Sequence, residues 1–160
     1  MPIPPRDSHS LRFIRTAQRR DIDRCCELLG QLAKIEQGFK HNPTLQRKGL
    51  EALLLREDAV VLVIGMGEVV IGMLSCQTVI STSMGAEVGL VEDVVIDQIF
   101  RGRGLGSALI HALYQWAESH NLRRLCLLAE GDNHSAHAFY ETHHWQKSTM
   151  HAWYVEMPND

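Results

Sequence analysis

The chain has little of what marks the specialised classes of protein. Its 160 residues include only four cysteines, Cys25, Cys26, Cys76 and Cys126, and none of them form a C-x-x-C pair. The formal net charge is −3, so the basic surface of a nucleic-acid-binding protein is not expected. The longest apolar run, AVVLVIGMG at 59–67, is too short to span a membrane. These absences favour a cytoplasmic protein whose partners include neither nucleic acid nor membrane.

The N-terminus also lacks a targeting signal. Its first ten residues, MPIPPRDSHS, have no apolar core of the kind that a signal peptide needs. The composition, 45% hydrophobic and 22% charged, is ordinary for one globular domain. We therefore expect a disordered tail at 1–10 and a single domain at 11–160.

The spacing of apolar residues predicts alternating strands and helices. Period-two runs indicate strands, and apolar residues repeated at three- and four-residue steps indicate amphipathic helices. The order indicates a mixed α+β fold with a mostly antiparallel sheet, one parallel pair formed by the strand–helix–strand unit at 87–130, and helices on both faces. The predicted strands are 11–17, 59–65, 69–80, 87–97, 123–130 and 151–157, and the predicted helices are 21–37 (capped by Asp21), 44–57 (with Leu45, Leu50, Leu53 and Leu54 buried), 104–119 and 134–143.

The stretch FRGRGLGSALI at 100–110 places three glycines and two arginines just before a predicted helix. The first N–H groups of a helix have no partner within it, and glycines let an anion approach them closely. Arg101 and Arg103 add permanent positive charge. A P-loop is excluded because its lysine is missing, and a dinucleotide fingerprint is excluded because Ser107 stands where its last glycine belongs. The stretch is typical of a pyrophosphate-binding turn, and a plain tight turn is the alternative.

Two adjacent acids interrupt the apolar strand GLVEDVVID at 89–97, Glu92 and Asp93. Adjacent strand residues face opposite ways, so one of the two is expected to line a cleft; an amphipathic strand with one acid capping a loop is the alternative. A half-buried carboxylate would have a raised pKa suited to accepting a proton. Glu92 is the first candidate for a general base and Asp93 the second, and Glu92 could instead bind a cationic amine.

Taken with a later NHSAHAFYETHHW stretch, these motifs resemble those of the GNAT superfamily of acetyl-coenzyme A-dependent N-acetyltransferases. The phosphate-binding pattern of this family is matched by Arg101, Gly104 and Gly106. Its later signature, an asparagine followed by a small residue and by Phe-Tyr, is matched within 133–140. The strand and turn look like those of the diamine and the glucosamine-6-phosphate N-acetyltransferases in particular. One position departs from the family: His144 stands where glycine usually follows the last helix. The residues that match the later signature are Asn133, Ala136, Phe139 and Tyr140.

The resemblance implies a GNAT fold whose parallel strands splay apart, and roles for individual residues. Tyr140 would donate a proton to the leaving thiolate, and the N–H groups of Val94 to Ile96 would bind the thioester oxygen. Asn133 would hold the pantetheine arm. The residues implied to bind acetyl-CoA are Val94, Val95, Ile96, Arg101, Gly102, Arg103, Gly104, Leu105, Gly106, Ser107, Asn133, Ala136 and Phe139.

The acceptor implied by the resemblance is a primary amine of a small molecule such as a polyamine, an amino sugar or an amino acid. A protein or peptide N-terminus and a non-catalytic acyl-CoA sensor are the alternatives. No metal is expected, because the four histidines between 134 and 144 have no cysteine beside them. Members of the superfamily often dimerise, which implies a homodimer in which 151–157 could be an edge strand.

Overall fold

The computed structural model describes residues 12–38 and 40–159. The chain divides into two compact units between Leu127 and Leu128, and each is described by itself. The tail expected at 1–10 lies outside the described residues, as do Leu11 of the first predicted strand and Phe39 of the loop after the first predicted helix.

The first unit is built on a five-stranded sheet with the strands side by side in chain order. The neighbours from β1 to β4 are antiparallel, and β4 pairs with β5 in parallel. This arrangement confirms the predicted fold class, and it places the one strand–helix–strand crossover between β4 and β5. The strands are β1 (Arg12–Thr16), β2 (Ala59–Met66), β3 (Val69–Ser81), β4 (Ala86–Ile96) and β5 (Leu125–Leu127).

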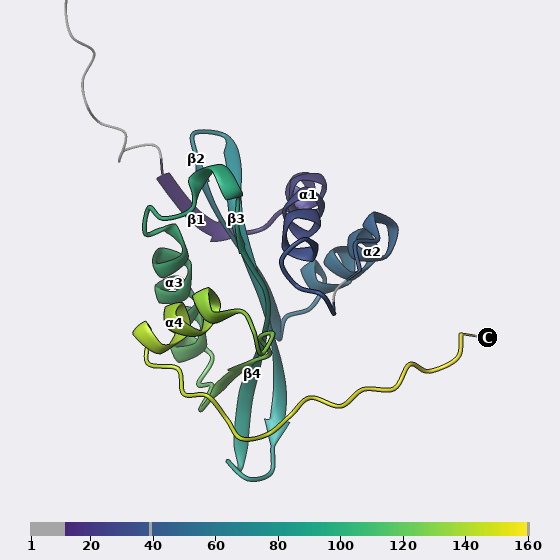
Figure 1. Cartoon of the computed structure of the whole chain (residues 1–160), viewed down its shortest axis with the longest axis vertical. Coiled ribbons are helices and arrows are strands. Elements are labelled where there is room, and N and C mark those ends of the chain that lie inside the picture. Colours follow the sequence, from purple (N-terminus) through teal and green to yellow (C-terminus); the bar gives the residue numbers. More distant parts are fainter. Residues whose placement is uncertain (1–11, 39, 160) are drawn as a thin grey trace, which may run out of the picture. The chain divides into compact units, whose positions relative to one another are not determined.

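Helices of this unit lie against both faces of the sheet, with α1 and α2 on one side and α3 on the other (Figure 1). Side chains alternate along β2 and divide the core: Val61 and Val63 pack with the buried stripe of α1, and Leu62 between them points to the opposite face. The helical segments are η1 (Arg19–Asp21), α1 (Ile22–Ala33), α2 (Pro43–Leu54), η2 (Gln98–Phe100) and α3 (Leu105–Ser119).

Two details of the N-terminal helices differ from the sequence prediction. The side chain of Asp21 does not cap α1; its carboxylate accepts hydrogen bonds from Arg15 at 2.6 Å and from the N–H of Gln18 at 2.7 Å, which closes η1 instead. Leu45 is 63% exposed, because it lies in the first turn of α2, whose buried contacts come from Leu50 and the residues after it.

Among residues 128–159, the described part of the second unit, the structure has one helix, α4 (His134–Thr142). The side chain of Asn133 caps it by accepting a hydrogen bond from the N–H of Ala136 at 3.2 Å. His144 follows with φ of 70°, so this residue does take the left-handed conformation that glycine adopts most freely.

The strand predicted at 151–157 is wrong. The structure has no helix or strand over residues 143–159, and Trp153 in this segment is 93% exposed. Alternation of apolar and polar residues suits a strand, but a strand forms only with a neighbour to accept its backbone hydrogen bonds. Among residues 128–159 no second strand is present to supply one. In the described residues no helix is long and apolar enough to cross a membrane.

Candidate active site

The pairing between the two parallel strands stops before β4 ends. β4 and β5 are paired only from Gly89↔Leu125 to Val91↔Leu127, whereas β4 continues to Ile96. The stretch from Glu92 to Ile96 therefore extends beyond the paired register. The backbone N–H groups that the resemblance assigns to a ligand, those of Val94 to Ile96, belong to this stretch.

β4 also carries an irregularity where the pairing with β5 has ended. Met73 pairs with Val95 and Ser75 pairs with Glu92, so two residues of β4, Asp93 and Val94, lie opposite the single residue between them on β3. Asp93 has φ of 59°, a conformation that aspartate adopts more often than most residues but that is unusual within a strand. Such a bulge redirects side chains, and bulges are frequent next to active sites.

The carboxylate at this bulge is partly shielded from water and lies near other carboxylates. Asp93 is half-buried, and Glu92 is exposed. Burial is the main cause that raises the pKa of Asp93 to about 6, the negative charges of Glu92 and Glu36 raise it further, and a hydrogen bond from Ser75 partly offsets them. The carbonyl of Glu92, 3.3 Å from the hydroxyl of Ser75, is a second acceptor for the same proton. A carboxylate with a pKa near 6 can accept a proton at neutral pH, and the raised pKa expected of one of the two acids is found at Asp93.

The glycine turn is open at the start of α3. Gly102 and Gly104 have φ of 76° and 78°, and a Cβ built on either one would meet no other atom within 4 Å. Gly104 is the N-cap of α3, and no side chain caps the first turn. Successive N–H groups in such a turn form an anion-binding concavity at the positive end of the helix dipole. The space at these two glycines is therefore not filled by the protein's own side chains, and it is open to an anionic ligand.

The two arginines of the turn are held differently. Arg101 donates through Nε to the carbonyl of Ile96 at 2.9 Å, which ties the turn back to the end of β4. The guanidinium of Arg103 lies over the ring of Phe100, 5.4 Å from its centroid. Both side chains are exposed, so their charge is accessible to an anionic ligand.

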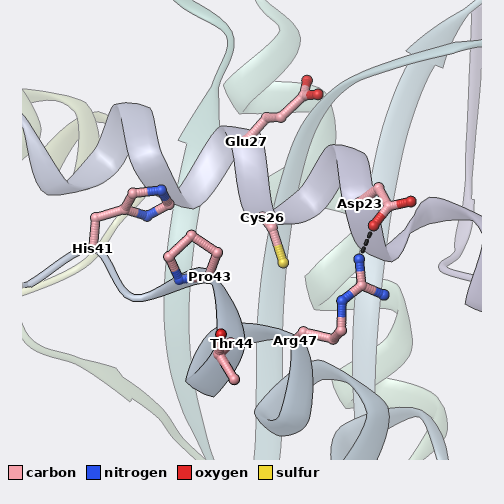
Figure 2. Close-up of a pocket in the computed structure, with 7 residues that line it drawn as sticks. All are labelled: Asp23, Cys26, Glu27, His41, Pro43, Thr44 and Arg47. Carbon is pink, nitrogen blue, oxygen red and sulfur yellow. Dashed lines mark ion pairs between the residues drawn. The ribbon is translucent and has the colours of Figure 1, made fainter.

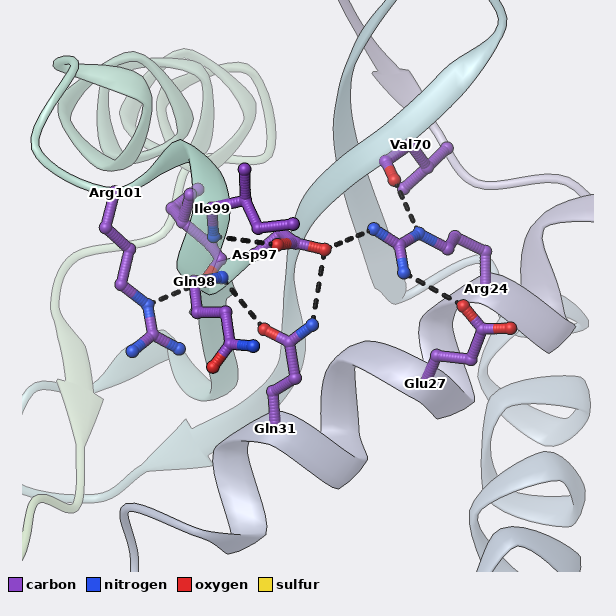
Figure 3. A network of polar contacts seen from close by, with 9 residues as sticks. Arg24, Glu27, Gln31, Val70, Asp97, Gln98, Ile99 and Arg101 are labelled. Atoms are coloured by element: carbon purple, nitrogen blue, oxygen red, sulfur yellow. Dashed lines mark hydrogen bonds and ion pairs between the residues drawn. The ribbon is translucent and has the colours of Figure 1, made fainter.

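A network of polar contacts joins α1 to the segment just before this turn (Figure 3). Asp97, which is 4% exposed, accepts hydrogen bonds from Arg24 at 2.5 Å, from Gln31 at 3.2 Å and from the N–H of Ile99 at 2.9 Å. Burial alone would raise the pKa of Asp97, but these hydrogen bonds outweigh it and lower the pKa below its usual value. No motif in the sequence points to these residues, since Arg24 and Asp97 are 73 positions apart.

The residues of the later signature lie together on α4 of the second unit. Asn133 caps the helix, and Ala136 supplies the N–H that it accepts. The ring of Tyr140 lies 5.3 Å from that of Phe139 and 5.7 Å from that of Trp145. Tyr140 is half-buried, so its ring is packed while part of it is accessible.

A pocket of 580 Å³ lies between α1 and α2. Figure 2 shows Asp23 and Arg47 joined as an ion pair at one side of it, and Glu27 is paired with Arg24. These ion pairs leave it a weaker candidate for a charged ligand than the bulge of β4. Its lining residues are Asp23, Cys26, Glu27, His41, Pro43, Thr44 and Arg47.

No group of three or more histidine, cysteine, aspartate or glutamate side chains that could hold a metal ion is found across residues 12–38 and 40–159. The four cysteines, all of them within those ranges, are free thiols.

A mostly antiparallel sheet whose one parallel pairing stops beside a bulge, followed by an open glycine turn at a helix N-terminus, has the features of an acyl-coenzyme A N-acyltransferase fold. The chain belongs to the GNAT family of acetyltransferases, whose model matches residues 23–145. Members of this family use acetyl-CoA, so the expectation of an acetyltransferase is confirmed.

Known proteins resemble the chain in sequence over a short part and in structure over nearly all of it. It is 36% identical over 56 residues to streptothricin acetyltransferase A of Bacillus subtilis (strain 168), a match that covers 35% of this chain and 32% of that protein. Glucosamine-6-phosphate N-acetyltransferase from Arabidopsis thaliana superposes with a TM-score of 0.71 at 24% identity, over 91% of this chain and 99% of the other. The aminoglycoside N-acetyltransferase AAC(6')-Iy, solved in complex with CoA, gives a TM-score of 0.81 at 18% identity, over 96% and 99% of the two chains.

Proposed function

We propose that the protein transfers the acetyl group of acetyl-CoA to a primary amine of a small, cationic molecule, by direct attack of the amine in a ternary complex. The observation that carries this proposal is the placement of Asp93, a half-buried carboxylate with a pKa of about 6, at the bulge of β4 beyond the paired stretch of β5. The open turn from Arg101 to Ser107 lies a few residues further along the chain. A base and a phosphate site at one end of one strand are what such a transfer requires.

Acetyl-CoA supplies the acetyl group as a thioester, and the glycine turn fits its diphosphate. The N–H groups of Leu105 and Gly106 at the start of α3, with Arg101 and Arg103, would bind the diphosphate. The backbone of Val94 to Ile96 would bind the arm and the carbonyl oxygen, while Asn133, Ala136 and Phe139 would contact the coenzyme from α4. The further turn residues in this assignment are Gly102, Gly104 and Ser107.

Asp93 is assigned the role of general base. An alkyl ammonium has a pKa near 10 and must lose a proton before it can attack a carbonyl carbon. Asp93 accepts that proton, directly or through water, as the new C–N bond forms. The C–S bond breaks, and Tyr140 donates a proton to the leaving sulfur. Glu92, the first candidate from the sequence, is exposed and sits beside Asp93, where its charge attracts a cationic amine.

The acceptor is proposed to be a molecule with several positively charged amines. The negative charges of Glu36 and Glu92 both act on Asp93, so negative charge is concentrated around this carboxylate and attracts cations. The names of the relatives are consistent with such acceptors, since streptothricin and aminoglycosides occur among them. A cytoplasmic location and a homodimer stay predictions.

The proposal is tested by measuring thiol release from acetyl-CoA with a panel of amines: polyamines, aminoglycosides, amino sugars, amino acids and peptides with a free N-terminus. Release that depends on a multiply charged small amine is the expected result. Coenzyme binding without release from any amine would favour the acyl-CoA sensor, and release with peptides alone would favour the peptide N-acetyltransferase.

Replacing Gly104 with alanine is expected to weaken CoA binding about tenfold or more, measured by isothermal titration calorimetry. The new Cβ would enter the open space in the turn, and φ of 78° disfavours any side chain. Gly85→Ala is the matched control, because Gly85 has φ of 59° and equally open surroundings, but lies in the turn between β3 and β4. Equal CoA affinity in the two variants would contradict the assignment of the turn.

A further inference from the structure

We propose that Asp97, held by Arg24 and Gln31 of α1, is a positioning residue that fixes the coenzyme-binding turn in the backbone conformation that binds the diphosphate. This inference rests on the proposed function, and it adds three residues that the family signature in the sequence does not include. It also assigns a task to α1 other than packing on the sheet.

The first step is that both backbone N–H groups at the start of η2 are held by side chains. Asp97 accepts from Ile99 at 2.9 Å through Oδ1, and Gln31 accepts from Gln98 at 2.9 Å through Oε1. The same glutamine donates through Nε2 to the other carboxylate oxygen of Asp97 at 3.2 Å. η2 is therefore attached to α1 by a closed set of hydrogen bonds (Figure 3).

The second step is that the carboxylate is itself anchored from two sides. Its Oδ2 accepts from Arg24 at 2.5 Å, and the backbone N–H of Asp97 donates to Ile71 at 2.7 Å. Arg24 in turn donates through Nε to the carbonyl of Val70 at 2.8 Å and pairs with Glu27. Asp97 is buried, and Arg24, its partner on α1, is held in place by the carbonyl of Val70 on β3. The carboxylate therefore has one well-defined position.

The third step is that η2 leads directly into the coenzyme turn. Phe100, its last residue, lies under the guanidinium of Arg103, and Arg101 follows it with its Nε on the carbonyl of Ile96. The positions of both arginines and the entry to Gly102 therefore depend on how η2 is held. Gly102 and Gly104 are free to adopt many other conformations, so the preceding segment must define the turn.

A second arginine–aspartate pair in the chain provides a matched control. Asp21 is buried to nearly the same degree as Asp97, with side chains 7% and 6% exposed, and their arginine partners, Arg15 and Arg24, are 29% and 27% exposed. Asp21 also accepts a backbone N–H at the start of a 3-10 turn. It joins β1 to the start of α1, so its loss should affect stability and not the coenzyme turn.

The test compares Asp97→Asn, Gln31→Met and Asp21→Asn in the full chain by calorimetry with CoA, by thermal unfolding and by steady-state kinetics. Asp97→Asn is expected to raise the Kd for CoA about tenfold, because an amide cannot accept hydrogen bonds at both of its ends as the carboxylate does. The KM for acetyl-CoA should rise with it, while kcat and the KM for the amine change by less than about threefold. Gln31→Met should also raise the Kd for CoA. Asp21→Asn should lose about as much thermal stability as Asp97→Asn but bind CoA like the wild type.

A merely structural role for Asp97 predicts that Asp21→Asn weakens CoA binding as much as Asp97→Asn does, and that outcome would overturn the inference. Unchanged CoA affinity in Gln31→Met would overturn it as well, and this variant decides the matter if Asp97→Asn does not fold. If the wild-type protein does not bind CoA, both the proposed function and this inference are wrong. Normal binding by the wild type and all three variants would remove the inference alone.

Discussion

Replacing Asp93 with asparagine is expected to lower kcat/KM by about 10²- to 10⁴-fold, the usual contribution of a positioned general base. An amide of the same size cannot accept the proton of the amine. Asparagine tolerates a φ of 59° nearly as well as aspartate, so the bulge of β4 should persist. Steady-state kinetics with the best amine of the panel would measure the effect, and CoA affinity should change little.

Two neighbouring carboxylates serve as controls. Glu92→Gln tests the first candidate from the sequence, and it is expected to raise the KM of a cationic amine while leaving most of kcat. Glu87→Gln changes an exposed acid on the same strand and should alter neither constant. If Glu92→Gln loses more kcat than Asp93→Asn, the base is Glu92 and the assignment made here is wrong.

The pH dependence of kcat/KM provides an independent readout of the same carboxylate. A base works only when deprotonated, so the plot of log kcat/KM against pH should bend near pH 6, where Asp93 titrates in the free enzyme. Below the bend the activity falls as the pH falls. The Asp93→Asn variant should lack the bend, and a bend that persists unchanged would assign it to another group.

Stability should respond to the same group with a definite sign. The folded-state pKa of Asp93 lies above its usual value, so protonation stabilises the folded protein at low pH, and this contribution is lost as the pH rises through about 6. At pH 7 the ionised carboxylate is a cost that Asp93→Asn removes. The variant should therefore unfold at the same or a higher temperature than the wild type, which separates its loss of activity from misfolding.

The fold could be predicted from sequence wherever local periodicity and tertiary contacts agree. The helix expected at 104–119 is α3, Leu105–Ser119, and the strands expected at 59–65, 69–80 and 87–97 match β2, β3 and β4 within one or two residues. Prediction failed where a pattern needs a partner that is far away in the sequence. HAWYVEM at 151–157 alternates as a strand does, but alternation says nothing about which neighbour would pair with it.

The site shows the same limit at the level of single residues. The sequence places Glu92 and Asp93 next to each other, and strict alternation predicts only that they face opposite ways. The extra residue in β4 and the left-handed conformation of Asp93 determine which of the two is buried, and neither has a local sequence signal. The Arg24–Asp97 contact joins an early helix to the end of a late strand, so only the folded chain brings it together.

Replacing Tyr140 with phenylalanine is expected to lower kcat by about 10²- to 10⁴-fold, the usual contribution of a positioned general acid, with little change in CoA affinity. The substitution keeps the ring that packs against Phe139 and Trp145 and the backbone carbonyl that accepts from Trp145 at 3.1 Å. It removes only the hydroxyl that would donate a proton to the leaving sulfur.

Tyr154→Phe is the control within the same unit, since Tyr154 is 91% exposed and has no assigned role. A thioester with a more acidic thiol, which needs less help to leave, should recover part of the lost rate in Tyr140→Phe and leave Asp93→Asn as slow as before. That difference would assign the two ends of the proton transfer to different residues, one on the bulge of β4 and one on α4. Equal recovery in both variants, or unchanged turnover in Tyr140→Phe, would show that the thiolate leaves without a proton from Tyr140.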